Sequence, residues 1–344
     1  MLQEVFVPGR LCVLGEHSDW AAEYRDRNGA VAYGMTVVCA TNEGLYATCG
    51  QYRPGTLRFS SASTAGEVRL MEFPMDFDSL NQTAVENGFF CYVAGTAAAL
   101  LKRYPVCGLS QPGIDINNYK TTLPMGKGLS SSAAVCVLVV QCFSVVFGLD
   151  ISVNECMELA YRGEMLTASK CGRMDQCVAM GPGRIGCMEF DRTDCHLQLL
   201  SCKTPLYFVV ADLNRGKCTV EILRSLSACF PFPLDETACL MHHYVAENQM
   251  LATAACVAIE GGHVTALAET MTRFQRLFDR TATVVCPSQL SSPRLHEVLD
   301  DPRVPGLSLA GKGVGSQGDG SVQFLCRDSD MQAKVITRHT IQCL

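Results

Sequence analysis

Residues 126–133 carry the residue types that bind phosphate, because two glycines are followed by three consecutive serines. Gly126 and Gly128 permit a tight backbone path and a close approach by a ligand. The apolar run that follows predicts a helix over residues 131–147, whose free N–H groups and positive dipole end attract an anion. The serine hydroxyls can cap this helix, contact phosphate or bind Mg²⁺. An ordinary serine-capped core helix has the same pattern, so this segment alone leaves both interpretations open.

Two further segments have the composition of ligand-binding loops. In residues 8–20 a short apolar strand ends at Gly15 and is followed by polar side chains that suit a polyhydroxylated ligand. In residues 310–321 alternate glycines precede a predicted strand over 322–325, which predicts a loop whose backbone wraps around phosphate. Each segment alone is a weak signal.

Taken together, in this order and at this spacing, the three segments resemble the signature motifs of the GHMP kinases. This family is named for galactokinase, homoserine kinase, mevalonate kinase and phosphomevalonate kinase. The resemblance covers residues 8–325. A fourth segment, CGRMDQ at residues 171–176, resembles the galactokinase-like sugar 1-kinases, in which a glycine-rich turn presents an aspartate to the hydroxyl that is phosphorylated.

The resemblance implies the catalytic residues. Asp175 is the implied base, and Arg10 is implied to lie beside it, where a fixed positive charge keeps the carboxylate ionised. Without the resemblance, the local sequence of Asp175 favours a turn or capping residue. Ser131 and Glu164 are the implied Mg²⁺ ligands, although Glu164 is equally typical of a solvated helix residue.

The resemblance also implies the substrate-binding residues. The sugar is expected to contact Glu16, His17, Asp19 and Gly172. Asp19 favours a sugar over mevalonate, because an additional carboxylate would repel an acidic substrate. Lys127 stands where the family more often has a small residue, and it is expected either to contact phosphate or to point to water. The residues implied to bind ATP are Gly126, Lys127, Gly128, Leu129, Ser130, Ser131, Ser132, Ala133, Gly313 and Gly315.

The predicted function is therefore an ATP-dependent sugar kinase that makes a sugar 1-phosphate. A mevalonate kinase-like enzyme is the alternative within enzymes, and a protein that binds sugar and ATP without catalysis is the alternative outside them. Residues 20–29 are longer and more charged than the tight turn of galactokinases, and the galactokinase helix signature of the second domain is not found. These departures favour a related sugar kinase and leave the sugar undefined.

Composition predicts the class of protein. The 344 residues, 48% of them hydrophobic, are enough for two domains, and the net charge of −6 with scattered basic residues argues against a nucleic-acid partner. Twenty cysteines lie mainly in apolar runs, which favours buried thiols in a reducing compartment. Residues 1–10 do not have the pattern of a secretory signal, and the apolar run 133–149 favours a buried helix over a membrane span. We expect a cytoplasmic protein; its oligomeric state is not predicted.

The fold class implied by the resemblance is α+β, with two domains. Residues 1–199 would form a domain like the second domain of ribosomal protein S5, and residues 200–344 a ferredoxin-like domain. Ser152 and Glu155 have the spacing of a capping box before a helix over 153–170. The other predicted elements are strands over 3–14, 30–41, 44–52, 56–60, 67–73 and 206–212 and helices over 88–102, 244–259 and 271–280.

Overall fold

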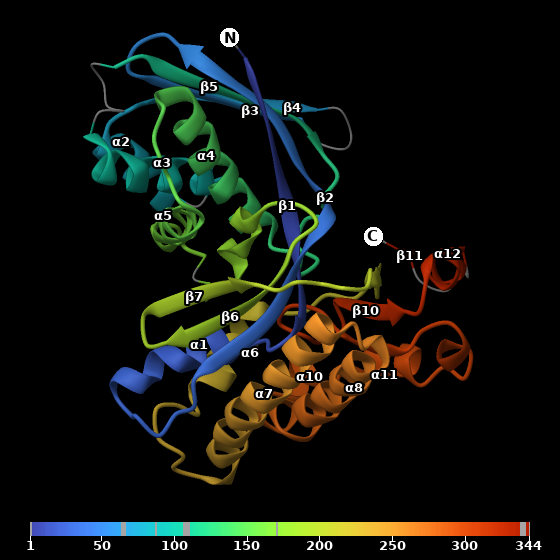
Figure 1. Ribbon diagram of the computed structural model, residues 1–344. Coiled ribbons are helices and arrows are strands. Elements are labelled where there is room, and N and C mark those ends of the chain that lie inside the picture. Colours follow the sequence, from blue (N-terminus) through green and yellow to red (C-terminus); the bar gives the residue numbers. More distant parts are fainter. Residues whose placement is uncertain are drawn as a thin grey trace. The chain divides into compact units, whose positions relative to one another are not determined.

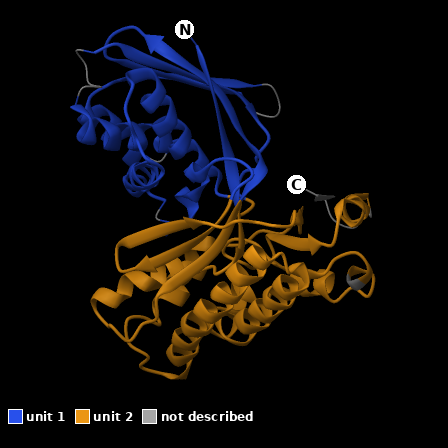
Figure 2. Cartoon of the chain, in the orientation of Figure 1, with its two compact units in different colours: residues 1–10, 40–126, 130–184 blue, residues 11–39, 127–129, 185–344 orange. Residues whose placement is uncertain are grey.

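The computed structural model describes residues 2–62, 67–86, 88–105, 111–169, 171–337 and 342–343. The chain forms two compact units, each assembled from several stretches of sequence (Figure 2). Unit 1 contains residues 1–10, 40–126 and 130–184, and unit 2 contains residues 11–39, 127–129 and 185–344. Compact units are not the same as family domains, so the domain boundary predicted between residues 199 and 200 stays a prediction.

Unit 1 contains a sheet with helices packed on one face (Figure 1). Its strand order is β4 (Val68–Pro74), β3 (Thr56–Ala62), β5 (Gly113–Thr121) and the later part of β2 (Gly34–Tyr52). The pair β3 and β5 is parallel, while β3 with β4 and β2 with β5 are antiparallel. The strand β1 (Gln3–Leu14) pairs with β2 and has the bounds expected from the sequence.

The strand β2 corrects the sequence prediction, because residues 30–41 and 44–52 were expected to form two strands. The structure has one strand, Gly34–Tyr52, which continues through Gly44. A Cβ atom on Gly44 would lie 2.3 Å from the carbonyl oxygen of Val7 in β1. This glycine therefore permits the close approach of two strands and does not mark a turn.

Four helices in unit 1 are α2 (Phe77–Val85), α3 (Cys91–Arg103), α4 (Ser131–Phe147) and α5 (Val153–Met165). The predicted bounds of α4 are confirmed, and most of its side chains are buried. Ser152 accepts a hydrogen bond from the Glu155 N–H at 3.2 Å, which confirms the predicted start of α5. The helix ends at Met165 and not at residue 170, which lies outside the described residues.

The helices α3 and α5 cross at two glycines. A Cβ atom on Gly95 would lie 2.4 Å from the Gly163 carbonyl oxygen, and one on Gly163 would lie 2.4 Å from the Cα atom of Thr96. Only glycine permits two helix backbones to approach this closely. The crossing therefore fixes the depth of the next residue along α5, Glu164, inside unit 1.

Unit 2 has a hydrophobic core centred on α7 (Glu236–Gly261) and α8 (Val264–Arg280). The Asp235 side chain caps α7 at its start, and Gly262 ends it in the left-handed conformation that glycine adopts without strain. The early part of β2 pairs with β6 (Ile185–Asp191), which pairs with β7 (Asp194–Leu199).

A second, antiparallel sheet in unit 2 has the order β11 (Gln342–Cys343), β8 (Tyr207–Asp212), β10 (Ser321–Cys326) and β9 (Ala310–Gly313). Helices separate β8 from β9, and α12 (Ser329–Thr337) separates β10 from β11. This β-α-β-β-α-β sequence with that strand order is the ferredoxin-like arrangement. The predicted α+β class is confirmed. The glycine segment 310–321 is not all loop, because its first four residues form β9.

In the described residues no helix is long and apolar enough to cross a membrane. Most of the eighteen cysteines whose side chains are described are buried. The other helices are α1 (Ser18–Ala22), α6 (Thr219–Ser227), α9 (Ala282–Val285), α10 (Pro287–Leu290) and α11 (Pro293–Leu299), with 3-10 helices η1 (Glu23–Asp26), η3 (Asp175–Met180) and η4 (Val304–Gly306).

Candidate active site

Unit 1 brings Arg10 and Asp175 together as an ion pair. Arg10 comes from β1 and donates from Nη2 to Oδ1 of Asp175, which begins η3. The Arg10 side chain is 3% exposed, whereas Asp175 keeps 25% of its side chain exposed. The guanidinium and the carboxylate form a charge-assisted hydrogen bond, and the carboxylate stays accessible to a ligand. Gly172 lies in the segment that leads into η3.

Glu164 on α5 is buried, with 1% of its surface exposed, so the alternative of a solvated helix residue is wrong. Its Oε2 atom accepts a hydrogen bond from Gln176 Nε2 at 2.9 Å. Burial, followed by the charge of Asp175, raises the pKa of the Glu164 carboxyl to about 7, although hydrogen bonds from Ser132, Cys171 and Gln176 oppose this rise.

The residues around Glu164 fit a divalent cation. Burial and Asp175 both disfavour the ionised carboxylate, and a bound cation would relieve that cost. Ser131, the other predicted ligand, lies at the start of α4 in the same unit, and a serine hydroxyl is the donor type that Mg²⁺ prefers. In the part of the chain that the structure describes, no three His, Cys, Asp or Glu side chains form a metal-binding group. Any Mg²⁺ here would therefore rely on few protein ligands, which is usual when phosphates supply the others.

The amino end of α4 lacks a side-chain cap. Ser130 adopts a left-handed conformation with φ of 60°, and its side chain makes no capping hydrogen bond, so the alternative of an ordinary serine-capped helix is wrong. Within the described structure the buried Ser130 hydroxyl has no hydrogen-bond partner. The first N–H groups of this helix, from Ser131 to Ala133, are therefore available to an anion, as expected for a phosphate site.

In unit 2, residues 127–129 lie against the glycine loop that follows β9. A Cβ atom on Gly315 would lie 3.0 Å from the Cα atom of Gly128, and both glycines have positive φ angles. Gly313 is equally enclosed, since its Cβ would meet the Gln317 side chain at 2.1 Å. Lys127 Nζ pairs with Asp212 Oδ2 at 2.5 Å. The sequence predicted contact with phosphate or with water, and neither prediction includes this carboxylate.

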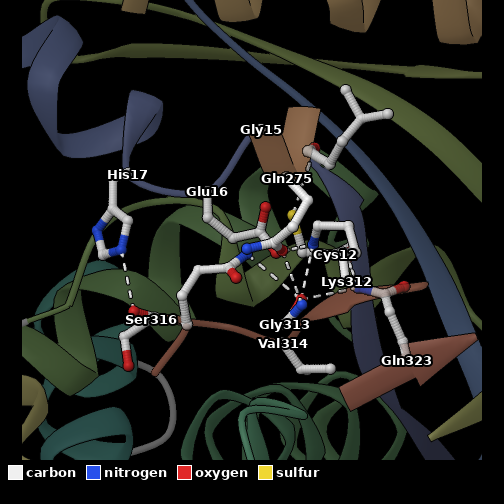
Figure 3. Close-up of polar contacts among 12 residues, drawn as sticks. Cys12, Gly15, Glu16, His17, Gln275, Lys312, Gly313, Val314, Ser316 and Gln323 are labelled. Atoms are coloured by element: carbon white, nitrogen blue, oxygen red, sulfur yellow. Dashed lines mark hydrogen bonds and ion pairs between the residues drawn. The ribbon is translucent and has the colours of Figure 1, made fainter. Parts of the chain in front are cut away.

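A buried ion pair joins the first and third motifs in unit 2 (Figure 3). Lys312 Nζ donates to Glu16 Oε1 at 2.5 Å and to the Gly313 carbonyl oxygen at 2.9 Å. Glu16 is 1% exposed and Lys312 is fully buried. The Tyr244 hydroxyl donates to the Glu16 carbonyl oxygen at 2.5 Å and holds the backbone of the motif.

His17 uses both of its ring nitrogens. Its Nδ1 accepts the indole N–H of Trp20 at 3.2 Å, so the neutral ring carries its proton on Nε2, which lies 3.4 Å from the Ser316 carbonyl oxygen (Figure 3). Burial, followed by the charges of Lys217 and Lys312, lowers the His17 pKa to about 4 despite the bond to Ser316. His17 therefore stays neutral and ties the first motif to the glycine loop.

Sequence reasoning gave no role to four residues that shape this region. Lys312 faces Gln323 across the β9–β10 pair, and the Gln323 side chain donates to the Cys12 carbonyl oxygen at 2.7 Å. Gln275 accepts the Gly313 N–H at 3.0 Å. Lys312 could have been noticed as a charge among glycines, whereas Tyr244 and Gln275 lie in helices without any motif. Asp19, the remaining predicted sugar ligand, is buried in the first turn of α1.

A sequence model described as the GHMP kinases N terminal domain matches residues 91–183. Among curated proteins, the galactokinase of Roseiflexus sp. (strain RS-1) is 31% identical over 232 residues, which are 65% of this chain and 50% of the relative. The galactokinase of Limosilactobacillus reuteri (strain DSM 20016) is 30% identical over 187 residues, or 52% of this chain and 42% of the relative. The chain thus matches about half the length of these relatives.

Solved structures resemble the chain over nearly its full length. The Lactococcus lactis galactokinase in complex with galactose has a TM-score of 0.72 at 17% identity, covering 96% of this chain and 87% of the other. The Methanococcus jannaschii mevalonate kinase also has a TM-score of 0.72, at 14% identity, covering 100% of this chain and 97% of the other. At these identities the likeness shows a shared fold.

Proposed function

We propose that the chain, whose residues 91–183 match the GHMP kinases N terminal domain, is an ATP-dependent kinase of a monosaccharide. The observation that carries the proposal is the pairing of Arg10 with Asp175, far apart in sequence, in one compact unit. The two curated relatives described above are galactokinases, which favours a sugar as the acceptor.

Asp175 would act as the general base. Its partly exposed carboxylate can accept the proton of an acceptor hydroxyl, while the ion pair with Arg10 holds it in one orientation. A fixed positive charge at this position can also stabilise the transferring phosphoryl group. General-base catalysis of this kind typically contributes roughly 10² to 10⁴ in rate.

The amino end of α4 would bind the nucleotide phosphates. Its uncapped N–H groups and its positive dipole end suit an anion, and Gly126 leaves open space where a side chain would otherwise project. In unit 2, we assign phosphate contacts separately to the backbone of Lys127, Gly128 and Leu129 and to the loop that holds Gly313 and Gly315.

Ser131 and Glu164 would hold Mg²⁺ through oxygen atoms. When bound, this ion neutralises phosphate charge and helps to position the group that is transferred. Glu164 must be ionised to bind the metal, and the hydrogen bonds that it accepts from Gln176 and Ser132 favour that form.

The sugar would be bound by Glu16, Asp19 and Gly172. We assign His17 a supporting part in this binding, because its two ring nitrogens are already engaged within unit 2. Glu16 and Asp19 are buried carboxylates, and such groups accept hydrogen bonds from sugar hydroxyls. Recognition of the other ring hydroxyls would leave the anomeric hydroxyl for phosphorylation and give a sugar 1-phosphate.

A mevalonate kinase-like activity is the second candidate, favoured by the full-length similarity to a mevalonate kinase structure. One assay separates the candidates: ADP release from ATP and Mg²⁺ with a panel of free monosaccharides and with mevalonate. We expect turnover with a sugar, and a product that no longer reacts as a reducing sugar. If the product still reacts as a reducing sugar, the phosphate lies elsewhere on the ring. Turnover of mevalonate and of no sugar favours the second candidate. Tight binding of a sugar without ADP release identifies a sensor.

A further inference from the structure

The two carboxylate oxygens of Glu16 have different surroundings. Oε1 is paired with Lys312 at 2.5 Å. Oε2 is buried and has no hydrogen-bond partner among the described residues. A buried acceptor without a donor is costly, and native structures rarely keep one without a reason. Figure 3 shows this carboxylate between the first motif and the strand that carries Lys312.

The ammonium group of Lys312 is held in place by three contacts. Its ammonium donates to Glu16 Oε1 and to the Gly313 carbonyl oxygen, and it lies 5.2 Å from the centre of the Phe274 ring, within the range of a cation–π contact. The backbone of β9 is fixed by its pairing with β10. Lys312 therefore presents one charge at one place and allows Glu16 one orientation.

We propose that Lys312 is a positioning residue for the substrate: it holds Oε1 of Glu16 and leaves Oε2 as a single buried acceptor for one hydroxyl of the sugar. The inference rests on the proposed function and adds a residue to it. The pair has no net formal charge, so the ligand that completes it is a neutral donor such as a hydroxyl. Tyr244 supports the same geometry by fixing the Glu16 backbone.

Trp20 gives a readout of binding that does not need turnover. It is the single tryptophan of the chain, and its indole donates to His17, the residue after Glu16. Titration of its fluorescence with the acceptor, without ATP, measures the dissociation constant at this motif. The acceptor is whichever compound of the panel the wild-type protein phosphorylates best. The variants are Lys312→Met, Lys312→Arg, Glu16→Gln and the double variant Glu16→Gln with Lys312→Met.

If Lys312 acts through Glu16, Lys312→Met and Glu16→Gln each raise the acceptor dissociation constant by about ten-fold or more, since each change removes or misplaces a buried charged acceptor. The double variant should bind as weakly as Glu16→Gln alone, because the two residues act as one unit. Lys312→Arg should restore part of the affinity, and the KM for ATP should stay within about two-fold in every variant.

Several outcomes overturn the inference. A folded Lys312→Met variant with normal acceptor affinity gives Lys312 a structural role only, and effects that multiply in the double variant show that it acts apart from Glu16. If Lys312→Met fails to fold, the double variant replaces it in the test, because the double variant leaves no unpaired buried charge. If the double variant binds the acceptor much more weakly than Glu16→Gln does, the proposal is contradicted.

If the wild-type protein phosphorylates mevalonate and no sugar, the proposed function fails, while the same set of variants measured with mevalonate still tests Lys312. If it accepts nothing, both fail.

Discussion

Exchange of Asp175 for asparagine removes the carboxylate that we propose as the proton acceptor and keeps the size of the side chain. We expect Asp175→Asn to lower kcat by roughly 10² or more, because a general base contributes about that much. ATP and sugar affinities should change only a few-fold, and steady-state kinetics with the best acceptor measures all three quantities. Asp191→Asn is the matched control, since Asp191 also pairs with an arginine, Arg25, but is half exposed on β6. Near-normal turnover in Asp175→Asn would show that another group removes the proton.

His17 makes the stability of the protein depend on pH. Its pKa is 6.5 in the unfolded chain and about 4 in the folded protein, mainly because the ring is buried. Between these values the unfolded chain binds a proton that the folded protein does not bind, so stability falls as the pH falls. The full loss corresponds to about 3 kcal/mol.

The variant His17→Gln isolates this effect, because glutamine cannot take up the proton. We expect the stability difference between wild type and variant to shrink by about 3 kcal/mol from pH 7 to pH 4. Urea unfolding at several pH values, followed by circular dichroism, measures this difference. A difference that stays constant with pH would mean that His17 does not titrate differently in the two states.

At the level of single residues, the sequence was informative where a motif resembled one with residues of known function. The resemblance placed Arg10 beside Asp175, and the structure has them paired. It gave no role to Lys312, because burial of a lysine depends on a partner, here Glu16, that lies 296 residues away. The neutral form of His17 was likewise not predicted, since it depends on burial and on the charges of Lys217 and Lys312, which lie far away in the sequence.

At the level of elements, the crossing of α3 and α5 determines where Glu164 lies. Gly163→Ala places a Cβ atom 2.4 Å from the Thr96 backbone, so the two helices must move apart. We expect a loss of roughly 1 to 3 kcal/mol in the free energy of unfolding, as is typical of overpacked cores. The control is Gly88→Ala in the same unit, where nothing lies within 4 Å of the added atom. Equal stability of the two variants in urea unfolding would contradict the tight crossing.

Predictions for elements succeeded where local signals were strong and failed where tertiary contacts decided. The apolar run and the residues before it defined α4, and Ser152 defined the start of α5. Residues 30–41 and 44–52 were predicted as two strands, because the close strand approach that explains Gly44 depends on Val7. The strand β9 was missed, because glycines weaken a strand signal and only its pairing with β10 makes it a strand.

At the level of the whole molecule, the sequence predicted the fold class and not the composition of the units. Residues 11–39 precede most of unit 1 in sequence and yet belong to unit 2. The hydrophobic pattern gives no sign of this, because β1 and β2 are continuous strands and each has residues in both units. Which part of a strand belongs to which core depends on residues such as Tyr244 that come much later in the chain.

The Glu16–Lys312 pair also determines when the first motif can fold during biosynthesis. A ribosome adds about 5 to 20 residues per second, so the 296 residues between the two partners take about 15 to 60 seconds to make. During that interval the Glu16 carboxylate has been synthesised and its counter-charge has not. Burial of an unpaired carboxylate is strongly unfavourable, so the first motif stays hydrated on the nascent chain. Its final structure forms only after the last motif has left the ribosome, which makes this early segment among the last to mature.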